Sequence, residues 1–188
     1  MIIPIGVAVV ALTTVVGCGT ESRPLPDSTQ TAAAGIPSVE RDRAEVLEHT
    51  AREIVEFLRD NAAFETIRLA DTATLYLSPE GGGTRTAFSR DQLRRPSQWV
   101  LRSGRQTYAF APPPALKKMT AKADIHFNCL EYPLALRFPE LAKLPHVGVK
   151  LEPDSAGSCL QTWNATFVFD PNARPPRLVA AVYDQWEW

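Results

Sequence analysis

The side chains best suited to acid–base chemistry lie on three segments in which apolar and polar residues alternate. This period-two spacing places polar and apolar side chains on opposite faces of an expected strand. The polar faces carry the candidate ligand-binding or catalytic residues His126, Asn128, Asn164 and Asp184. A histidine that titrates near a carboxylate is the usual starting point for general base catalysis. If the strands are neighbours, these residues line one polar cleft; the alternative is a solvated sheet face, which antiparallel sheets commonly have.

Three cysteines, Cys18, Cys129 and Cys159, raise a second chemical question. Cys129 shares the expected apolar face of its segment with Phe127, and Cys159 shares a face with Trp163. Both sulfur atoms therefore point toward one core, which predicts a disulfide between Cys129 and Cys159 in an oxidising compartment. The chain-entropy model gives a loop of this size a stabilisation of roughly 3.5 kcal/mol.

A zinc site is the alternative use of the same region, because His126 and Cys129 have His-x2-Cys spacing. Structural zinc sites usually have a second closely spaced pair of ligands, whereas His146 and Cys159 are well separated in the sequence. The alternation also turns His126 away from the face of Cys129. We therefore expect the disulfide rather than a metal site, and no cofactor.

Two further segments contain residue types found at catalytic sites. The triple glycine 81–83 is not followed by the Lys and Ser/Thr of a phosphate-binding loop. The segment 155–158, Ser-Ala-Gly-Ser, lacks the Gly-x-Ser-x-Gly pattern of a nucleophile elbow. Both are typical of plain turns, so the sequence favours a protein that is not an enzyme.

The remaining cysteine, Cys18, ends an apolar segment. Residues 1–17 carry no charged side chain, and the sequence Val15-Val16-Gly17-Cys18 places aliphatic and small residues directly before the cysteine. This arrangement resembles the lipobox of bacterial lipoproteins. A basic residue normally precedes such an apolar run and is absent here, as it would be in a chain whose start lies further upstream.

The lipobox resemblance implies cleavage of the signal peptide 1–17, a diacylglyceryl group on the sulfur of Cys18 and acylation of the new amino terminus. It implies a lipid-anchored protein of the bacterial cell envelope, outside the cytoplasm, and Gly19 implies the outer membrane if the host has one. An uncleaved anchor and a non-lipidated signal peptide are the alternatives. Residues 18–38, rich in Ser, Thr, Ala, Gly and Pro, are typical of a flexible tether.

The charge pattern suggests a binding partner. The net charge of −1 excludes a wholly basic nucleic-acid binder, but residues 84–123 hold nine basic residues and one acidic residue. The candidate anion-binding residues in this segment are Arg90, Arg94, Arg95, Arg102, Arg105, Lys117 and Lys118. In an exported protein we expect anionic lipid or an acidic envelope polymer as partner, and no nucleic acid. The alternative is that these residues are solvated or pair with the acidic segment 39–60.

The elements that must position these residues follow from periodicity and turn signals. Apolar residues at helical spacing predict an amphipathic helix over 39–60, and alternation predicts a strand over about 67–77 with a bulge at Asp71. Ser89 to Gln92 fit a capping box, and 99–110 fit a hairpin around Ser103-Gly104. Further strands are expected at about 124–130, 147–152, 159–169 and 177–187, with a short helix near 139–144.

This order of elements predicts an α+β fold, with an N-terminal amphipathic helix packed on a bent antiparallel sheet in one domain, 39–188. The layout is similar to the cystatin-like and nuclear-transport-factor-2-like folds in its order of elements alone. The favoured function is a non-enzymatic, lipid-anchored binding or scaffolding domain. The alternatives are a small-ligand or hydrolase-like site around His126 and Asp184, and an assembly protein that exposes Trp186, Trp188 or Tyr132. No pattern in the sequence indicates an oligomeric state.

Overall fold

The computed structural model describes residues 38–60, 68–78, 83–123, 125, 127, 133–154 and 161–184. All of them belong to one compact unit, residues 36–188. The described residues of its two hydrophobic clusters lie between Leu47 and Tyr183.

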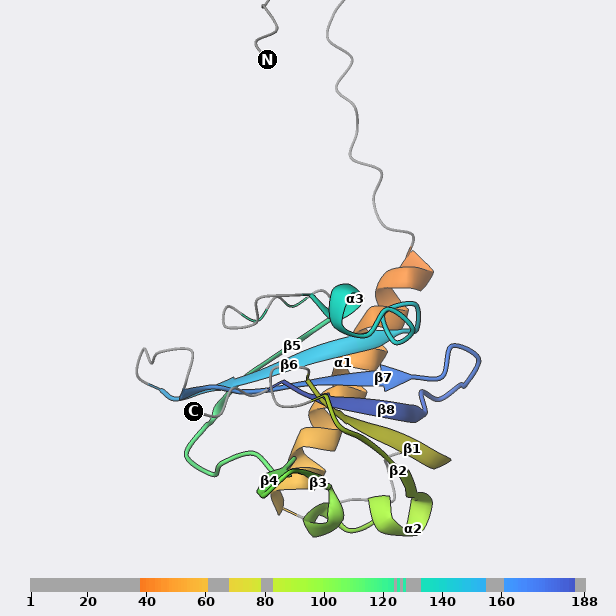
Figure 1. Cartoon of the computed structure of the whole chain (residues 1–188). Coiled ribbons are helices and arrows are strands. Elements are labelled where there is room, and N and C mark those ends of the chain that lie inside the picture. Colours follow the sequence, from red (N-terminus) through yellow and green to blue (C-terminus); the bar gives the residue numbers. More distant parts are fainter. Residues whose placement is uncertain are drawn as a thin grey trace, which may run out of the picture. The chain divides into compact units, whose positions relative to one another are not determined.

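The helix α1 spans Ser38–Asp60 and confirms the helix expected over 39–60. Its buried residues recur every three or four positions and form one stripe: Leu47, Ala51, Ile54, Val55, Phe57 and Leu58. Glu40 lies in its first turn and Arg59 in its last, which matches the polarity of the helix dipole. Figure 1 shows α1 crossing the sheet obliquely.

A six-stranded sheet carries this helix, in the order β2-β1-β8-β7-β6-β5. Its strands are β1 (Leu69–Leu77), β2 (Arg85–Ser89), β5 (Lys118–Lys122), β6 (His146–Glu152), β7 (Trp163–Phe169) and β8 (Leu178–Tyr183). Four of the five pairings among these described strands are antiparallel, and β1 pairs with β8 in parallel. The α+β class is therefore confirmed, and the sheet is mixed. A tight turn joins antiparallel strands, whereas the long connection between β1 and β8 allows them to pair in parallel.

Local signals in the sequence located several elements correctly. The β1–β8 register shifts between Leu69 and Thr74, which confirms the irregularity expected at Asp71. The strands β3 (Val100–Ser103) and β4 (Gln106–Ala109) form the expected hairpin, and Gly104 adopts a positive φ of 60° in its turn. Glycine suits this position because it has no Cβ to clash in the left-handed region.

The strand expected at 124–130 is wrong for the described residues of that range, because Ile125 and Phe127 lie outside any strand. The edge strand beside β6 is β5, not the segment 124–130. Met119 and Ala121 of β5 contact the core. Ile125 and Phe127 lie over Gly148 of β6, where an added Cβ would be 2.0 Å from Ile125 Cγ2. Ile125 and Phe127 thus fill the space that the missing side chain of Gly148 leaves.

The short helix expected near 139–144 is also wrong in position. The helix α3 spans Leu134–Arg137, directly after Pro133, and residues 139–143 form turns. Pro133 suits the N-cap of α3, because its missing N–H would have no intrahelical partner there. Leu134, Phe138 and Leu141 then bury their side chains against the sheet.

The sheet is consequently covered on both faces. On the α1 face, the side chains of β7 that contact the core are Trp163, Ala165, Phe167 and Phe169, as the alternation predicts. On the opposite face, here called the α3 face, α3 and the turns after it cover Tyr76, Val168, Ala180 and Val182. The ring of Phe138 contacts Tyr76 edge-on, with the ring centres 5.2 Å apart.

Candidate functional site

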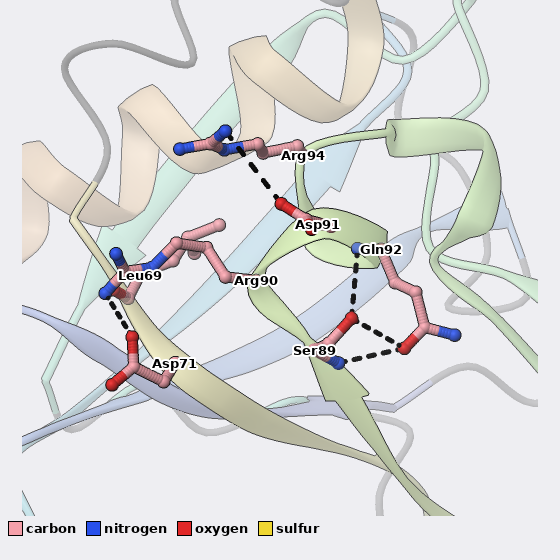
Figure 2. A network of polar contacts seen from close by, with 7 residues as sticks. All are labelled: Leu69, Asp71, Ser89, Arg90, Asp91, Gln92 and Arg94. Atoms are coloured by element: carbon pink, nitrogen blue, oxygen red, sulfur yellow. Dashed lines mark hydrogen bonds and ion pairs between the residues drawn. The ribbon is translucent and has the colours of Figure 1, made fainter.

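The basic segment is held in place by a short helix that follows β2. In α2 (Arg90–Leu93), Ser89 caps the helix by accepting a hydrogen bond from the backbone N–H of Gln92, whose side chain accepts one from the Ser89 N–H. This confirms the expected capping box, and Figure 2 shows its contacts. Leu93 is fully buried and anchors α2 to the core. Its carbonyl oxygen accepts a hydrogen bond of 2.7 Å from Trp99 Nε1.

Two arginines of this segment pair with nearby carboxylates (Figure 2). Arg90 Nη2 lies 2.7 Å from Asp71 Oδ1 and also donates to the Leu69 carbonyl oxygen, so it links α2 to β1. Arg94 Nη1 lies 3.9 Å from Asp91 Oδ1, and both side chains are largely exposed. Exposed pairs of this kind contribute at most about 1 kcal/mol to stability.

Three arginines line a groove of about 580 Å³ between the end of α1 and the start of the 3-10 helix η2 (Pro96–Gln98). This arginine groove is lined by Leu58, Arg59 and Asp60 from α1 and by Arg94, Arg95, Pro96, Ser97 and Ala111. Its lining holds three cationic side chains and one carboxylate. Three guanidinium groups against one carboxylate give the lining an excess of positive charge, which attracts an anion.

Arg59 is the least exposed of the three arginines, with 20% of its side chain accessible. Its Nη2 donates a 2.8 Å hydrogen bond to the Leu116 carbonyl oxygen, and its Nη1 lies 3.7 Å from Glu56 Oε2. Its Nε is buried and has no hydrogen-bond partner among the described residues. A buried N–H without a partner costs free energy, and the two-point contacts of Arg59 with Leu116 and Glu56 hold its guanidinium group at the edge of the groove.

The other predicted anion-binding residues do not join the arginine groove. Arg102 and Arg105 are exposed on the β3–β4 hairpin, and Lys117 is exposed before β5. Lys118 Nζ lies 3.9 Å from Glu152 Oε2 across the β5–β6 pair. The structure thus brings together Arg94 and Arg95, and adds Arg59, which sequence reasoning missed because it belongs to the acidic helix.

The aromatic residues of the basic segment are not on its surface. Trp99, Tyr108 and Phe110 are buried in the core, where Trp99 contacts Phe57 of α1 with ring centres 6.3 Å apart. Phe110 also packs against Tyr183 of β8, at 5.3 Å between ring centres. These rings therefore anchor the basic segment to the core, whereas Arg102 and Arg105 of the hairpin are exposed.

The candidate acid–base residues fall partly within the described structure. Asn164 and Asp184 are neighbours on the α3 face, and the Asp184 N–H donates to the Asn164 carbonyl oxygen. His126 and Asn128 lie outside the described residues, as do Cys18, Cys129 and Cys159, the segments 1–17 and 18–37, and Tyr132, Trp186 and Trp188. The structure therefore places one half of the predicted constellation.

Asp184 is fully buried and takes part in an ion pair. Its Oδ1 accepts a hydrogen bond from Arg137 Nη1, at the end of α3, and its Oδ2 accepts one of 2.8 Å from the Thr166 hydroxyl. The Arg137 side chain is 4% exposed, so both charges are removed from water. The sequence alone does not point to Arg137, because only the tertiary fold brings the end of α3 to Asp184.

The amide of Asn164 completes this polar group. It is 3% exposed, and its Nδ2 donates to the Thr162 hydroxyl at 3.1 Å. Its Oδ1 is buried without a hydrogen-bond partner among the described residues. Asn164, Thr166 and Asp184 thus form a buried polar cluster that joins β7, β8 and α3 beneath the covering chain.

A second charged cluster lies at the edge of the sheet. Lys150 Nζ contacts Glu152 Oε1 at 2.6 Å, and Lys118 approaches the other carboxylate oxygen. The hydrogen bond from Lys150 holds the pKa of Glu152 below its ordinary value, against a smaller opposing effect of burial. Glu152 therefore remains ionised at mildly acidic pH.

Comparison with protein-family models, with curated proteins and with solved structures found no match for this chain. Within the described ranges, no helix combines the length and the apolar character needed to cross a membrane. The same residues contain no group of three or more His, Cys, Asp or Glu side chains placed to hold a metal ion. The interpretation below therefore rests on the geometry of the arginine groove and on the sequence.

Proposed function

We propose that this chain is a lipid-anchored protein of the bacterial cell envelope whose folded unit binds an anionic group in the arginine groove. The observation that carries the proposal is the convergence of Arg59, Arg94 and Arg95 on one groove of about 580 Å³, although Arg59 is far from the other two in the sequence. Guanidinium groups present several N–H donors in a plane and bind phosphate and carboxylate oxygens in two-point contacts.

The dimensions of the arginine groove fit a phosphate or carboxylate group that belongs to a larger molecule. A volume of about 580 Å³ exceeds that of a single phosphate ion, and the lining residues Arg94, Arg95 and Ser97 are solvent-facing. An anionic lipid headgroup and a repeating unit of an acidic envelope polymer share this chemistry. We therefore propose a binding or scaffolding role rather than a catalytic one.

The proposed anchor rests on the lipobox resemblance of residues 15–18. We expect a Cys18-dependent increase in the mass of the mature protein, measured on the intact chain from cells that carry the lipoprotein-processing pathway. A Cys18→Ala variant should retain the uncleaved segment 1–17 and lack the lipid. A wild-type chain that is cleaved but not lipidated would contradict the anchor and leave the arginine groove to be tested separately.

Anion binding can be tested on residues 36–188, because this unit contains the whole described core. The probes are vesicles of phosphatidylglycerol and phosphatidylcholine in equal parts, vesicles of phosphatidylcholine alone, and inorganic pyrophosphate. We expect binding to the anionic probes that weakens with added salt, since exposed charges are screened within about 10 Å at 0.1 M. Binding to vesicles but not to pyrophosphate would favour the lipid headgroup as the source of the anion.

The matched variants separate the arginine groove from general positive charge. Arg94→Gln/Arg95→Gln removes two groove arginines, and Arg102→Gln/Arg105→Gln removes two exposed arginines of the hairpin. We expect the groove variant to raise the Kd about tenfold or more, because each hydrogen bond to a charged group contributes about 1.5–3 kcal/mol. Equal losses in both variants would overturn the groove as the site, and so would the absence of binding at low salt.

A further inference from the structure

At the other end of α1, a smaller cavity of about 160 Å³ lies between the helix and the turn that joins β7 to β8. We call it the turn cavity. It is lined by Arg43, Val46 and Leu47 from α1 and by Asp170, Ala173, Arg174 and Pro176 from the turn. Its walls are therefore mostly aliphatic, and two guanidinium groups are the cationic groups in its lining. It shares no lining residue with the arginine groove.

The two arginines of the turn cavity compete for the same acceptor. Arg43 Nη2 donates to the Pro171 carbonyl oxygen at 3.1 Å, and Arg174 Nη1 approaches the same oxygen at 3.3 Å. Arg174 Nη1 also donates to the Ala173 carbonyl oxygen at 2.8 Å. Two positive charges thus lie close together around neutral oxygen atoms, an arrangement that an anion placed between them would stabilise.

The carboxylate in the lining does not neutralise these arginines by direct contact. Asp170 Oδ1 accepts a hydrogen bond from the Asn172 N–H at 2.9 Å, within its own turn. No ion pair joins Asp170 to Arg43 or Arg174 in this described region. An anionic ligand would therefore sit on the arginine side of the turn cavity, away from Asp170.

The size of the turn cavity limits the rest of the ligand. An apolar cavity of roughly 150 Å³ accommodates one benzene molecule. The lining residues Leu47, Ala173 and Pro176 supply an apolar contact surface of that scale, and Leu47 and Ala173 are both less than 9% exposed. The exposed Val46 lies at the rim, where a ligand would cover part of its side chain.

We infer that the turn cavity binds a small carboxylic acid with an apolar body about the size of a benzene ring. The carboxylate is held by Arg43 and Arg174, and the apolar body contacts Leu47, Ala173 and Pro176. This site is independent of the proposed anion binding in the arginine groove.

The experiment is a titration of isotope-labelled residues 36–188 with benzoate, followed by amide resonances in two-dimensional NMR spectra. The control probes are benzyl alcohol, which keeps the ring and removes the charge, and acetate, which keeps the charge and removes the ring. We expect saturable shifts at Leu47, Ala173 and their neighbours with benzoate, and binding at least tenfold weaker for either control.

Three variants test the assignment. Arg43→Gln/Arg174→Gln should weaken benzoate binding about tenfold or more, because charge-assisted hydrogen bonds are lost. Arg177→Gln, an exposed arginine of the same turn outside the lining, should leave the affinity unchanged. Ala173→Leu should fill the turn cavity and abolish binding, and its circular dichroism spectrum would confirm that the fold is retained.

Several outcomes would overturn this inference. They are unchanged affinity in the double arginine variant, equal binding of benzyl alcohol, and no saturable shift with millimolar benzoate. Shifts centred on Arg94 and Arg95 would assign benzoate to the arginine groove instead. Because the variants of the two sites share no residue, the failure of one site is distinguishable from the failure of the other.

Discussion

The central strands β7 and β8 are buried on both faces of the six-stranded sheet, but the two faces are buried by different chemistry. The α1 face packs aliphatic and aromatic side chains against one long helix, with Ile54 and Phe167 fully buried. The α3 face has a smaller apolar cluster beside the ion pair of Arg137 with Asp184. An apolar contact tolerates many partners of similar size, whereas a buried charge requires one particular partner in one position. The α3 face therefore depends on fewer, more specific contacts.

The largest expected effect comes from breaking the ion pair. Arg137→Met should lower the free energy of unfolding by about 3–5 kcal/mol, because it leaves the Asp184 carboxylate buried without its partner. Chemical denaturation of residues 36–188 measures this change. Adding Asp184→Asn should restore more than half of the loss, since the uncompensated charge is then gone while the Thr166 hydroxyl keeps an acceptor.

The matched change on the α1 face is Ile54→Ala. We expect a loss of about 2–5 kcal/mol from the removed apolar contacts and the cavity left behind. The comparison between the faces predicts that Asp184→Asn gives no recovery in this background. Recovery in both backgrounds would mean that Asp184 destabilises the fold whatever its partner, and the contrast between the faces would then be lost.

Gly148 tests the packing of the α3 face by overfilling it. Gly148→Ala places a Cβ 2.0 Å from Ile125 Cγ2, so the side chain of Ile125 must move away from β6. Overpacking of this kind costs about 1–3 kcal/mol, which a thermal melt detects. The variant Ile125→Ala in the same background should relieve part of the cost; if it does not, Ile125 is not the contact responsible.

The cap of α2 lies outside both faces and should have a smaller effect. Ser89→Ala removes the side-chain acceptor of the capping box and should lower the free energy of unfolding by about 1 kcal/mol. Because α2 carries Arg94 toward the arginine groove, pyrophosphate binding should also weaken. Ser89→Asn, which keeps a capping oxygen, should retain both stability and binding.

The smallest expected effect is the pH dependence contributed by Glu152. Its pKa in the folded state is lowered by Lys150, so its stabilising contribution is present above its ordinary pKa of 4.5 and is lost as the pH falls below that value. The side chain is partly exposed, so we expect less than about 1 kcal/mol. Glu152→Gln should flatten the stability profile below that pH, and an unchanged profile would contradict the assignment.

Local patterns were sufficient to predict α1, the strands β1 and β6, the β3–β4 hairpin and the capping box of α2. Each of these depends on residues within a few positions of one another, such as Ser89 with Gln92. The prediction failed for β5, because Ile125 and Phe127 alternate like strand residues but lie outside any strand. It failed for α3, because that helix begins directly after Pro133 rather than near residue 139. The parallel pairing of β1 with β8 was missed for a related reason, since no turn signal connects strands so far apart.

The candidate sites show the same division. The sequence alone identified the basic segment, the core-facing side chains of β7 and the polar positions Asn164 and Asp184, because composition and alternation are local properties; that the polar side of β7 is also buried was not predicted. Only the tertiary structure selected Arg59, Arg94 and Arg95 as one groove and joined Arg137 to Asp184. The physical reason is that charge interactions depend on distance and burial, and both are decided by which strands and helices become neighbours when the chain folds.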